Sequence, residues 1–280
     1  MSIRFADLSS SASLLAVLLL CAMAMSSGCT DATAQSTAPT ASDAVASPIA
    51  VVELFTSEGC SSCPPADELL SALAAESRRD GRPVHLLAFH VDYWDRLGWK
   101  DPYADAAFTH RQQKYADHFA SRGTYTPQMV VNGTTDFVGS NRAKASRAID
   151  EALKRKSTAS VKLTGLTRAA GTATVNYSVI PTPPNAVIHI ALVERELVTN
   201  VRNGENAGRS LRHDNVVRHF QTIALADAGQ GTALVKLPPS LRAEHSSVIA
   251  YVQHTEDRSV LGATSVDLNG IAARPTSAVR

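Results

Sequence analysis

The chain has few cysteines, little net charge and only a short apolar run, and each shortage excludes a class of protein. Four cysteines in 280 residues are too few for an exported fold built on a disulfide framework. The formal net charge of +1 gives no reason to expect nucleic acid as a partner. The apolar run Leu14–Met25 is shorter than the roughly 20 residues of a membrane-spanning helix. We therefore expect a globular protein with no spanning segment in this run.

The N-terminal 29 residues have the pattern of an export signal. Arg4 lies in a short polar start, and the apolar run after it has the length of a signal-peptide core. Two processing routes remain open. Small residues at 22–24 and 32–34 suit ordinary signal cleavage, whereas Ser-Ser-Gly-Cys at 26–29 resembles a bacterial lipobox that would lipidate Cys29. Either route predicts an exported protein, in the bacterial periplasm or anchored to a membrane as a lipoprotein.

The rest of the chain divides by composition into four segments. Residues 30–48 are small and polar, so they predict a disordered tether. Residues 49–156 alternate apolar strand runs with helical patterns in the order β-α-β-α-β-β-α, which predicts an α/β domain. Short strand runs between glycine and proline turns predict a mostly antiparallel, β-sandwich-like region over 157–268. Residues 269–280 are expected to be a frayed tail.

Cys60 and Cys63 are the two cysteines that remain after the leader and Cys29. They lie between a buried strand run and a helix that opens on prolines. Unpaired N–H groups at a helix start favour a thiolate, so Cys60 is expected to be the exposed attacking thiol and Cys63 the resolving one. Two alternatives stay open. The pair could form an inert disulfide, or it could bind Cu(I) through both thiolates with His90 as a third ligand.

Other polar residues near the pair are candidates for the same site. Glu53 lies in the buried strand run and could relay a proton, or it could simply pair with a lysine or arginine. The stretch 203–214 predicts a long loop that either folds over the dithiol, with Arg209 facing an anionic substrate, or stays a solvated surface loop. Three residues after the second strand run could wall the dithiol and contact substrate, or only pack their loop: Asp92, Tyr93 and Trp94.

The element order and two further motifs resemble the thioredoxin fold. Thr126-Pro127 enters a short strand, and Asn132-Gly133 predicts the hairpin turn that follows it. In that fold the proline is cis and packs opposite the dithiol. The resemblance therefore implies that Pro127 belongs to the catalytic site and that Thr126 contributes backbone contacts to the substrate.

Four segments also resemble an uncharacterised bacterial secreted family, domain of unknown function 1223. They are residues 53–67, which include the CxxC pair, and residues 90–95, 204–209 and 213–217. The resemblance extends over about residues 50–268. It implies a thioredoxin-like fold and brings no established substrate.

The sequence as a whole predicts an exported thiol–disulfide oxidoreductase that works through a mixed disulfide. It needs no cofactor beyond the redox-active disulfide Cys60–Cys63. The expected partners are envelope proteins with thiols or disulfides, with a membrane electron donor if the protein reduces them, and the direction of electron flow stays open. The membrane is a partner only through a lipid anchor. The rival is a non-enzymatic binding protein that holds Cu(I) or presents a docking surface.

Overall fold

The computed structural model describes residues 47–169, 171–225 and 228–270. The predicted export signal, the lipidation site Cys29 and nearly all of the tether lie outside these residues, as does the tail from residue 271. None of the helices within the described ranges is long and apolar enough to cross a membrane.

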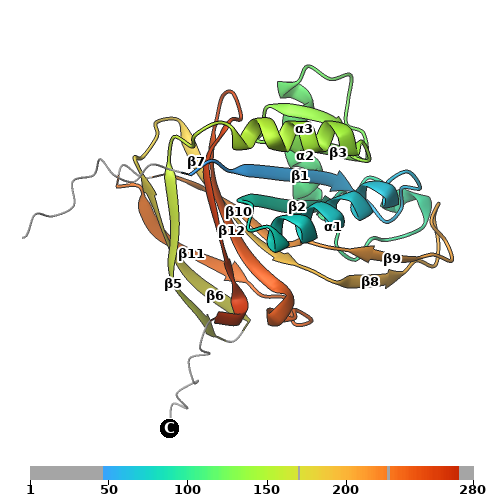
Figure 1. The fold of residues 1–280 in the computed structure, drawn as a ribbon. Helices are drawn as coiled ribbons and strands as arrows, with labels where there is room; N and C mark the ends of the chain where they lie inside the picture. Colours follow the sequence, from blue (N-terminus) through green and yellow to red (C-terminus); the bar gives the residue numbers. More distant parts are fainter. Residues whose placement is uncertain (1–46, 170, 226–227, 271–280) are drawn as a thin grey trace, which may run out of the picture. The chain divides into compact units, whose positions relative to one another are not determined.

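An eight-stranded mixed sheet forms the centre of the described region, with the strand order β13-β12-β7-β10-β2-β1-β3-β4 (Figure 1). Its strands β1 and β2 are parallel and almost fully buried, in keeping with their uninterrupted apolar sequences. The bounds are β1 Ala50–Thr56, β2 Val84–His90, β3 Gln128–Val131, β4 Thr135–Val138, β7 Ala186–Glu194, β10 Val216–Ala224, β12 Ser246–His254 and β13 Val260–Asp267.

Three α-helices cover the β1 end of this sheet. Helices α1 (Pro64–Arg79) and α3 (Arg142–Leu153) pack on one face, against the alternate residues of β1 that include Leu54. Helix α2 (Ala106–His118) packs on the opposite face, where Val51 and Phe55 point. Because successive side chains of a strand point to opposite faces, neighbouring residues of β1 enter different cores. Three short 3-10 helices span Asp95–Leu97, Ala243–His245 and Leu268–Gly270.

A second sheet of three strands, in the order β11-β6-β5, packs on the β7 and β12 end of the large sheet. Its strands are β5 (Ser160–Ala169), β6 (Thr172–Ile180) and β11 (Gln230–Lys236). Strands β8 (Leu197–Asn200) and β9 (Ser210–His213) form a separate two-stranded hairpin. In Figure 1 this hairpin extends along the end of the sheet at which α1 begins. It thereby reaches the CxxC segment.

The sequence predicts a thioredoxin-like α/β domain followed by a β-sandwich-like region, and this fold class is wrong. The order of the first seven elements agrees with the prediction. Their strands, however, form only half of a sheet that β10, β7, β12 and β13 complete. The two halves join where Ala88 of β2 pairs with Val216 of β10. Because β2 is buried on both faces and would otherwise leave an unpaired edge, the C-terminal strands continue the sheet.

Candidate functional site

The dithiol lies where β1 leads into α1, as the sequence predicts, but it is not exposed. Both cysteines are free thiols, and each has 0% of its surface accessible. Cys63 is the residue that precedes the first turn of α1, and its backbone N–H donates to the carbonyl of Cys60 at 3.2 Å. The prediction of an exposed Cys60 is therefore wrong, because other segments of the chain cover the helix start.

The two sulfurs differ in acidity. The thiol of Cys63 donates to Cys60, and with hydroxyls from Ser62 and Thr126, each 3.3 Å from the sulfur, it lowers the pKa of Cys60 to about 6. Burial, the hydrogen bond to Cys60 and the negative charge of that sulfur raise the pKa of Cys63. One thiolate and one thiol therefore lie side by side at neutral pH. The thiolate is the nucleophilic form.

The Thr126–Pro127 peptide bond is cis, and Thr126 brings its hydroxyl to the dithiol. The indole N–H of Trp94 donates to Thr126 Oγ1 at 2.8 Å. Trp94 also packs against the chain before Cys60, because a Cβ placed on Gly59 would lie 3.1 Å from its own Cβ. Trp94 therefore supports the site through Thr126.

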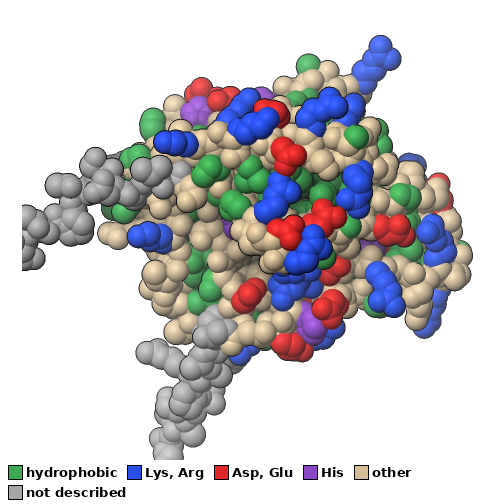
Figure 2. Space-filling model, in the orientation of Figure 1, with side chains coloured by type: hydrophobic (Ala, Val, Ile, Leu, Met, Phe, Trp, Pro, Cys, Tyr) green, Lys and Arg blue, Asp and Glu red, His purple; other side chains and the backbone are tan. Residues whose placement is uncertain are grey.

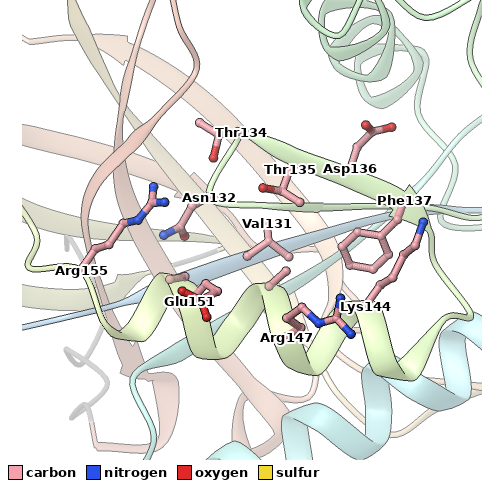
Figure 3. A pocket seen from close by; sticks show the side chains of 12 residues that line it. Val131, Asn132, Thr134, Thr135, Asp136, Phe137, Lys144, Arg147, Glu151 and Arg155 are labelled. Atoms are coloured by element: carbon pink, nitrogen blue, oxygen red, sulfur yellow. The ribbon is translucent and has the colours of Figure 1, made fainter.

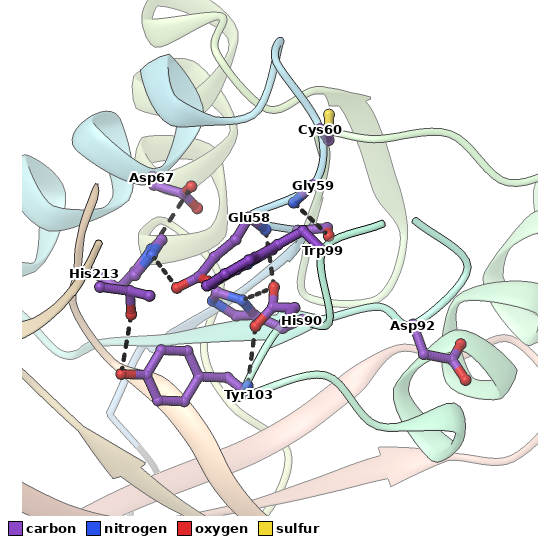
Figure 4. Close-up of polar contacts among 12 residues, drawn as sticks. Glu58, Gly59, Cys60, Asp67, His90, Asp92, Trp99, Tyr103 and His213 are labelled. Atoms are coloured by element: carbon purple, nitrogen blue, oxygen red, sulfur yellow. Dashed lines mark hydrogen bonds and ion pairs between the residues drawn. The ribbon is translucent and has the colours of Figure 1, made fainter. Parts of the chain in front are cut away.

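Asp92 and Tyr93, which precede Trp94, both bond to α2, and the Tyr93 hydroxyl also lies near Thr126. Asp92 accepts a hydrogen bond from Thr109 at 2.6 Å, and the hydroxyl of Tyr93 donates to Gln112 at 3.2 Å, both on α2. Figure 4 shows Asp92 apart from the polar cluster. For Asp92 these contacts fit the alternative in which it packs its loop, whereas Tyr93 also borders the dithiol through Thr126.

Glu53 does not lie with the dithiol. Its side chain is buried on the α2 face of the sheet, whereas the dithiol helix packs on the other face. Both carboxylate oxygens accept from Arg111, at 2.6 and 2.8 Å, and Tyr115 adds a third bond at 2.8 Å. The structure thus agrees with pairing to an arginine rather than with a proton relay to the sulfurs.

Asp67 is the carboxylate that the structure places beside the thiols, and sequence reasoning missed it. It lies four residues after Cys63 on α1, and residues with this spacing share one helix face. Burial raises the pKa of Asp67 to about 7, against the opposing attraction of His213. His213 Nδ1 is 3.8 Å from Asp67 Oδ2, and its Nε2 is 3.1 Å from Glu58 Oε1 (Figure 4). The i,i+4 spacing was the available signal.

A second buried pair holds the segment before the dithiol. His90 Nδ1 and Asp101 Oδ2 are 2.8 Å apart, and the same oxygen accepts from the backbone N–H of Glu58 at 2.8 Å. Although burial opposes ionisation, the attraction between them raises the pKa of His90 and lowers that of Asp101. His90 is thus engaged with Asp101 rather than with the sulfurs. Among the described residues, no group of three or more His, Cys, Asp or Glu side chains is arranged to hold a metal ion.

The loop between β8 and β9 folds over the CxxC segment, which was one of the two predicted alternatives. The Nδ2 of Asn206 donates to the carbonyls of Glu58 and Cys60, at 2.8 and 2.9 Å. Glu205 accepts from the backbone and the hydroxyl of Ser61, at 2.9 and 2.7 Å. The guanidinium of Arg209 donates to Asn206 Oδ1 at 2.8 Å.

Two cavities differ in their relation to this site. One of about 420 Å³ lies between α3 and strands β3 and β4, with Lys144 and Arg147 at its rim (Figure 3), and contains neither cysteine. A smaller one of about 140 Å³ is lined by Asp67 and His213 beneath β9. Acidic and basic side chains are interspersed on the face seen in Figure 2, as the sequence predicts.

Comparisons with known proteins identify a family and no activity. A protein of known crystal structure from Agrobacterium tumefaciens, AGR_C_4864, is 26% identical, with a TM-score of 0.59 over 82% of this chain and 98% of that chain. A domain of the outer membrane lipoprotein Omp28 from Porphyromonas gingivalis aligns over 39% of this chain and 94% of that chain. It is 14% identical with a TM-score of 0.25, too low to establish a shared fold. No curated protein matches the sequence. The model of the family described as "Protein of unknown function (DUF1223)" matches residues 51–253, and the chain belongs to this family.

Proposed function

We propose that the protein is a thiol–disulfide oxidoreductase of the bacterial cell envelope. The observation that carries the proposal is a pair of adjacent thiols whose pKa values shift in opposite directions. The pKa of Cys60 is lowered to about 6, and the pKa of Cys63 is raised. A stable nucleophilic thiolate beside a protonated resolving thiol is the arrangement that exchange with a disulfide requires. The envelope location rests on the signal-like N-terminus.

Reduction of a substrate disulfide by the dithiol has two steps. The Cys60 thiolate attacks one substrate sulfur, the substrate S–S bond breaks, and the released thiolate takes a proton from solvent. Cys63 then gives its proton to the Asp67 carboxylate and attacks Cys60 Sγ, which breaks the mixed disulfide and releases the second substrate thiolate. The substrate gains two electrons and the dithiol becomes a disulfide. In reverse, the same steps oxidise a substrate dithiol. The partner's potential decides the direction.

Asp67 is the proton acceptor in this scheme because of its place and its acidity. It lies one helical turn from Cys63, and its pKa of about 7 lets it exist in both protonation states near neutral pH. The cavity beside Asp67 and His213 gives the proton a route toward solvent. Glu53 has no part in the scheme, since Arg111 already neutralises it.

A trapping experiment tests the proposal. In a Cys63→Ala variant, mixed disulfides between Cys60 and envelope proteins should accumulate, disappear on reduction, and be absent when Cys60 is also replaced by alanine. The native pair should exchange between dithiol and disulfide in glutathione buffers. A pair that neither exchanges nor traps a partner would contradict the proposal. Stoichiometric copper in protein purified under reducing conditions, lost in Cys60→Ala, would support the Cu(I)-binding rival instead.

A further inference from the structure

The loop that joins β8 to β9, residues 201–209, lies against the CxxC segment, and we call it the strap. Two backbone hydrogen bonds close its base, from Val201 N to Arg209 O and from Gly208 N to Val201 O, both at 2.9 Å. Its two flanking strands pair only with each other within the described region. The strap is therefore a separate element whose hold on the large sheet depends on side-chain contacts.

Those contacts are directed at main-chain groups next to the attacking sulfur. Asn206 is fully buried, and its amide bridges the carbonyls of Glu58 and Cys60. Glu205 lies at the surface and accepts a hydrogen bond from the backbone N–H of Ser61, which lies between the two cysteines. The strap thus satisfies two main-chain acceptors and one main-chain donor within residues 58–61, and also accepts from the hydroxyl of Ser61. Cys60 has no exposed surface while these bonds are made.

Because Cys60 has no exposed surface, an incoming disulfide can reach it only if a neighbouring segment opens, and the strap is a neighbouring segment whose flanking strands do not pair with the described strands of the large sheet. Buried main-chain groups that lose their partners cost free energy, so the easiest opening is one in which the incoming molecule replaces the bonds. A polypeptide offers an N–H and a carbonyl at each residue and can take over both kinds of contact. A small disulfide without amide groups cannot.

We propose that the strap makes the dithiol selective for polypeptide disulfides, with Asn206 and Glu205 as the residues that set this selectivity. The inference rests on the proposed redox function for its substrate. The physical basis of the strap proposal is a cover that controls access to Cys60, and this does not depend on turnover. The strap proposal and the redox proposal can therefore fail separately.

Alkylation of Cys60 by iodoacetamide measures access without redox chemistry. Alkylation rates should be compared at pH values above the pKa of Cys60, where the rate reaches a plateau and the thiolate fraction no longer changes. Peptide mass mapping should confirm that the alkylated residue is Cys60. Asn206→Ala should raise the plateau rate by about tenfold or more, as expected for the loss of two buried hydrogen bonds. Glu205→Gln should raise it less. Because Glu205 is exposed, this variant tests the strap even if Asn206→Ala folds poorly.

Asn203→Ala is the matched control. Asn203 is an exposed asparagine in the same strap, and its side chain makes no hydrogen bond to the described residues, so its replacement should leave the rate unchanged. If wild-type Cys60 reacts as fast as a thiol in an unfolded peptide, or if neither strap variant reacts faster than the control, the proposal is wrong.

Selectivity is tested by comparing two oxidants. Wild-type protein should be oxidised faster by a cystine-containing peptide than by hydroxyethyl disulfide at equal concentration. Asn206→Ala should bring the two oxidation rates closer together, because an open site raises the rate with hydroxyethyl disulfide more than the rate with the peptide. Equal gains for both oxidants would show that the strap covers the site without selecting substrates. A third outcome separates the two proposals. If the strap variants are alkylated faster but neither oxidant oxidises the protein, the redox function is contradicted and the role of the strap as a cover of Cys60 still holds.

Discussion

Two buried carboxylates, Glu53 and Asp67, lie on opposite faces of the same sheet and have different surroundings. Glu53 has a bidentate arginine and a tyrosine hydroxyl within hydrogen-bonding distance. Asp67 has the imidazole of His213 at 3.8 Å and the hydroxyl of Thr56 nearby, and its Oδ1 has no hydrogen-bond partner among the described residues. The first carboxylate has a full-charge partner and a structural role. The weaker partner leaves the second with a pKa near neutrality.

The difference shows how the fold separates stability from chemistry. On the α2 face, Arg111 also contacts Tyr251 and Gln253 of β12, so one ion pair ties the N-terminal and C-terminal halves of the sheet. On the α1 face, the polar groups surround the dithiol and the strap. A buried carboxylate with an incomplete set of partners is a candidate for proton transfer, whereas a fully paired one is not.

The largest expected effect comes from breaking the paired side. Arg111→Leu leaves the Glu53 carboxylate buried with only the Tyr115 hydroxyl and no charged partner, and should lower the free energy of unfolding by about 3–5 kcal/mol, measured in urea. The pH profile of Cys60 alkylation should stay as in wild type, because the pair lies on the other face.

Arg82→Leu is the control for that change. Arg82 pairs with Asp150, and the two side chains are 36% and 57% exposed, so the loss should be at most about 1 kcal/mol. Equal losses in the two arginine variants would contradict the view that the Glu53–Arg111 pair anchors the fold.

The next effect is expected from neutralising Asp67. Its pKa rises from 3.8 to about 7 on folding, so its contribution to stability is complete below about pH 4 and declines as pH rises to about 7. Asp67→Asn should match wild type in acid and be more stable above pH 7 by up to about 4 kcal/mol, at about 1.4 kcal/mol per pKa unit. Urea unfolding across this pH range measures the difference.

The same variant should slow resolution of the mixed disulfide, on the order of a hundredfold at neutral pH, because Cys63 loses its proton acceptor. Stopped-flow measurement of substrate thiol release separates this step from the first attack, which should be unaffected. Glu68→Gln, an exposed neighbour on α1, is the control and should change neither quantity. A variant that gains no stability above pH 7 would show that burial does not raise the pKa of Asp67.

Local sequence was enough to predict the position of the cysteine pair and the start of α1, because each depends on residues close together in the chain. The approach of Thr126-Pro127 to the pair joins segments 66 residues apart, and it was predicted from the resemblance to the thioredoxin fold. Local sequence was not enough for the sheet, where the join between Ala88 and Val216 spans more than a hundred residues and has no local signature. Asp67 was missed for a related reason. Its spacing from Cys63 is visible in the sequence, but its environment depends on His213, which β9 delivers from a distant segment. For Glu53, burial was predicted and pairing with a lysine or arginine was one of two alternatives, but the identity of the partner, Arg111 on α2, was not predicted.

The smallest effect concerns the acidity of Cys60 itself. Thr126→Val removes a hydroxyl that donates to the sulfur and should raise the pKa of Cys60 by about one unit, seen in the ultraviolet absorbance of the thiolate. Trp94→Phe removes only the bond that orients that hydroxyl and should raise the pKa by less. Trp99→Phe is the matched control, since its indole donates to Glu58 instead. If the Trp99 variant shifts the pKa as much as the Trp94 variant, then general packing, and not the hydrogen bond through Thr126, sets the acidity of the thiol.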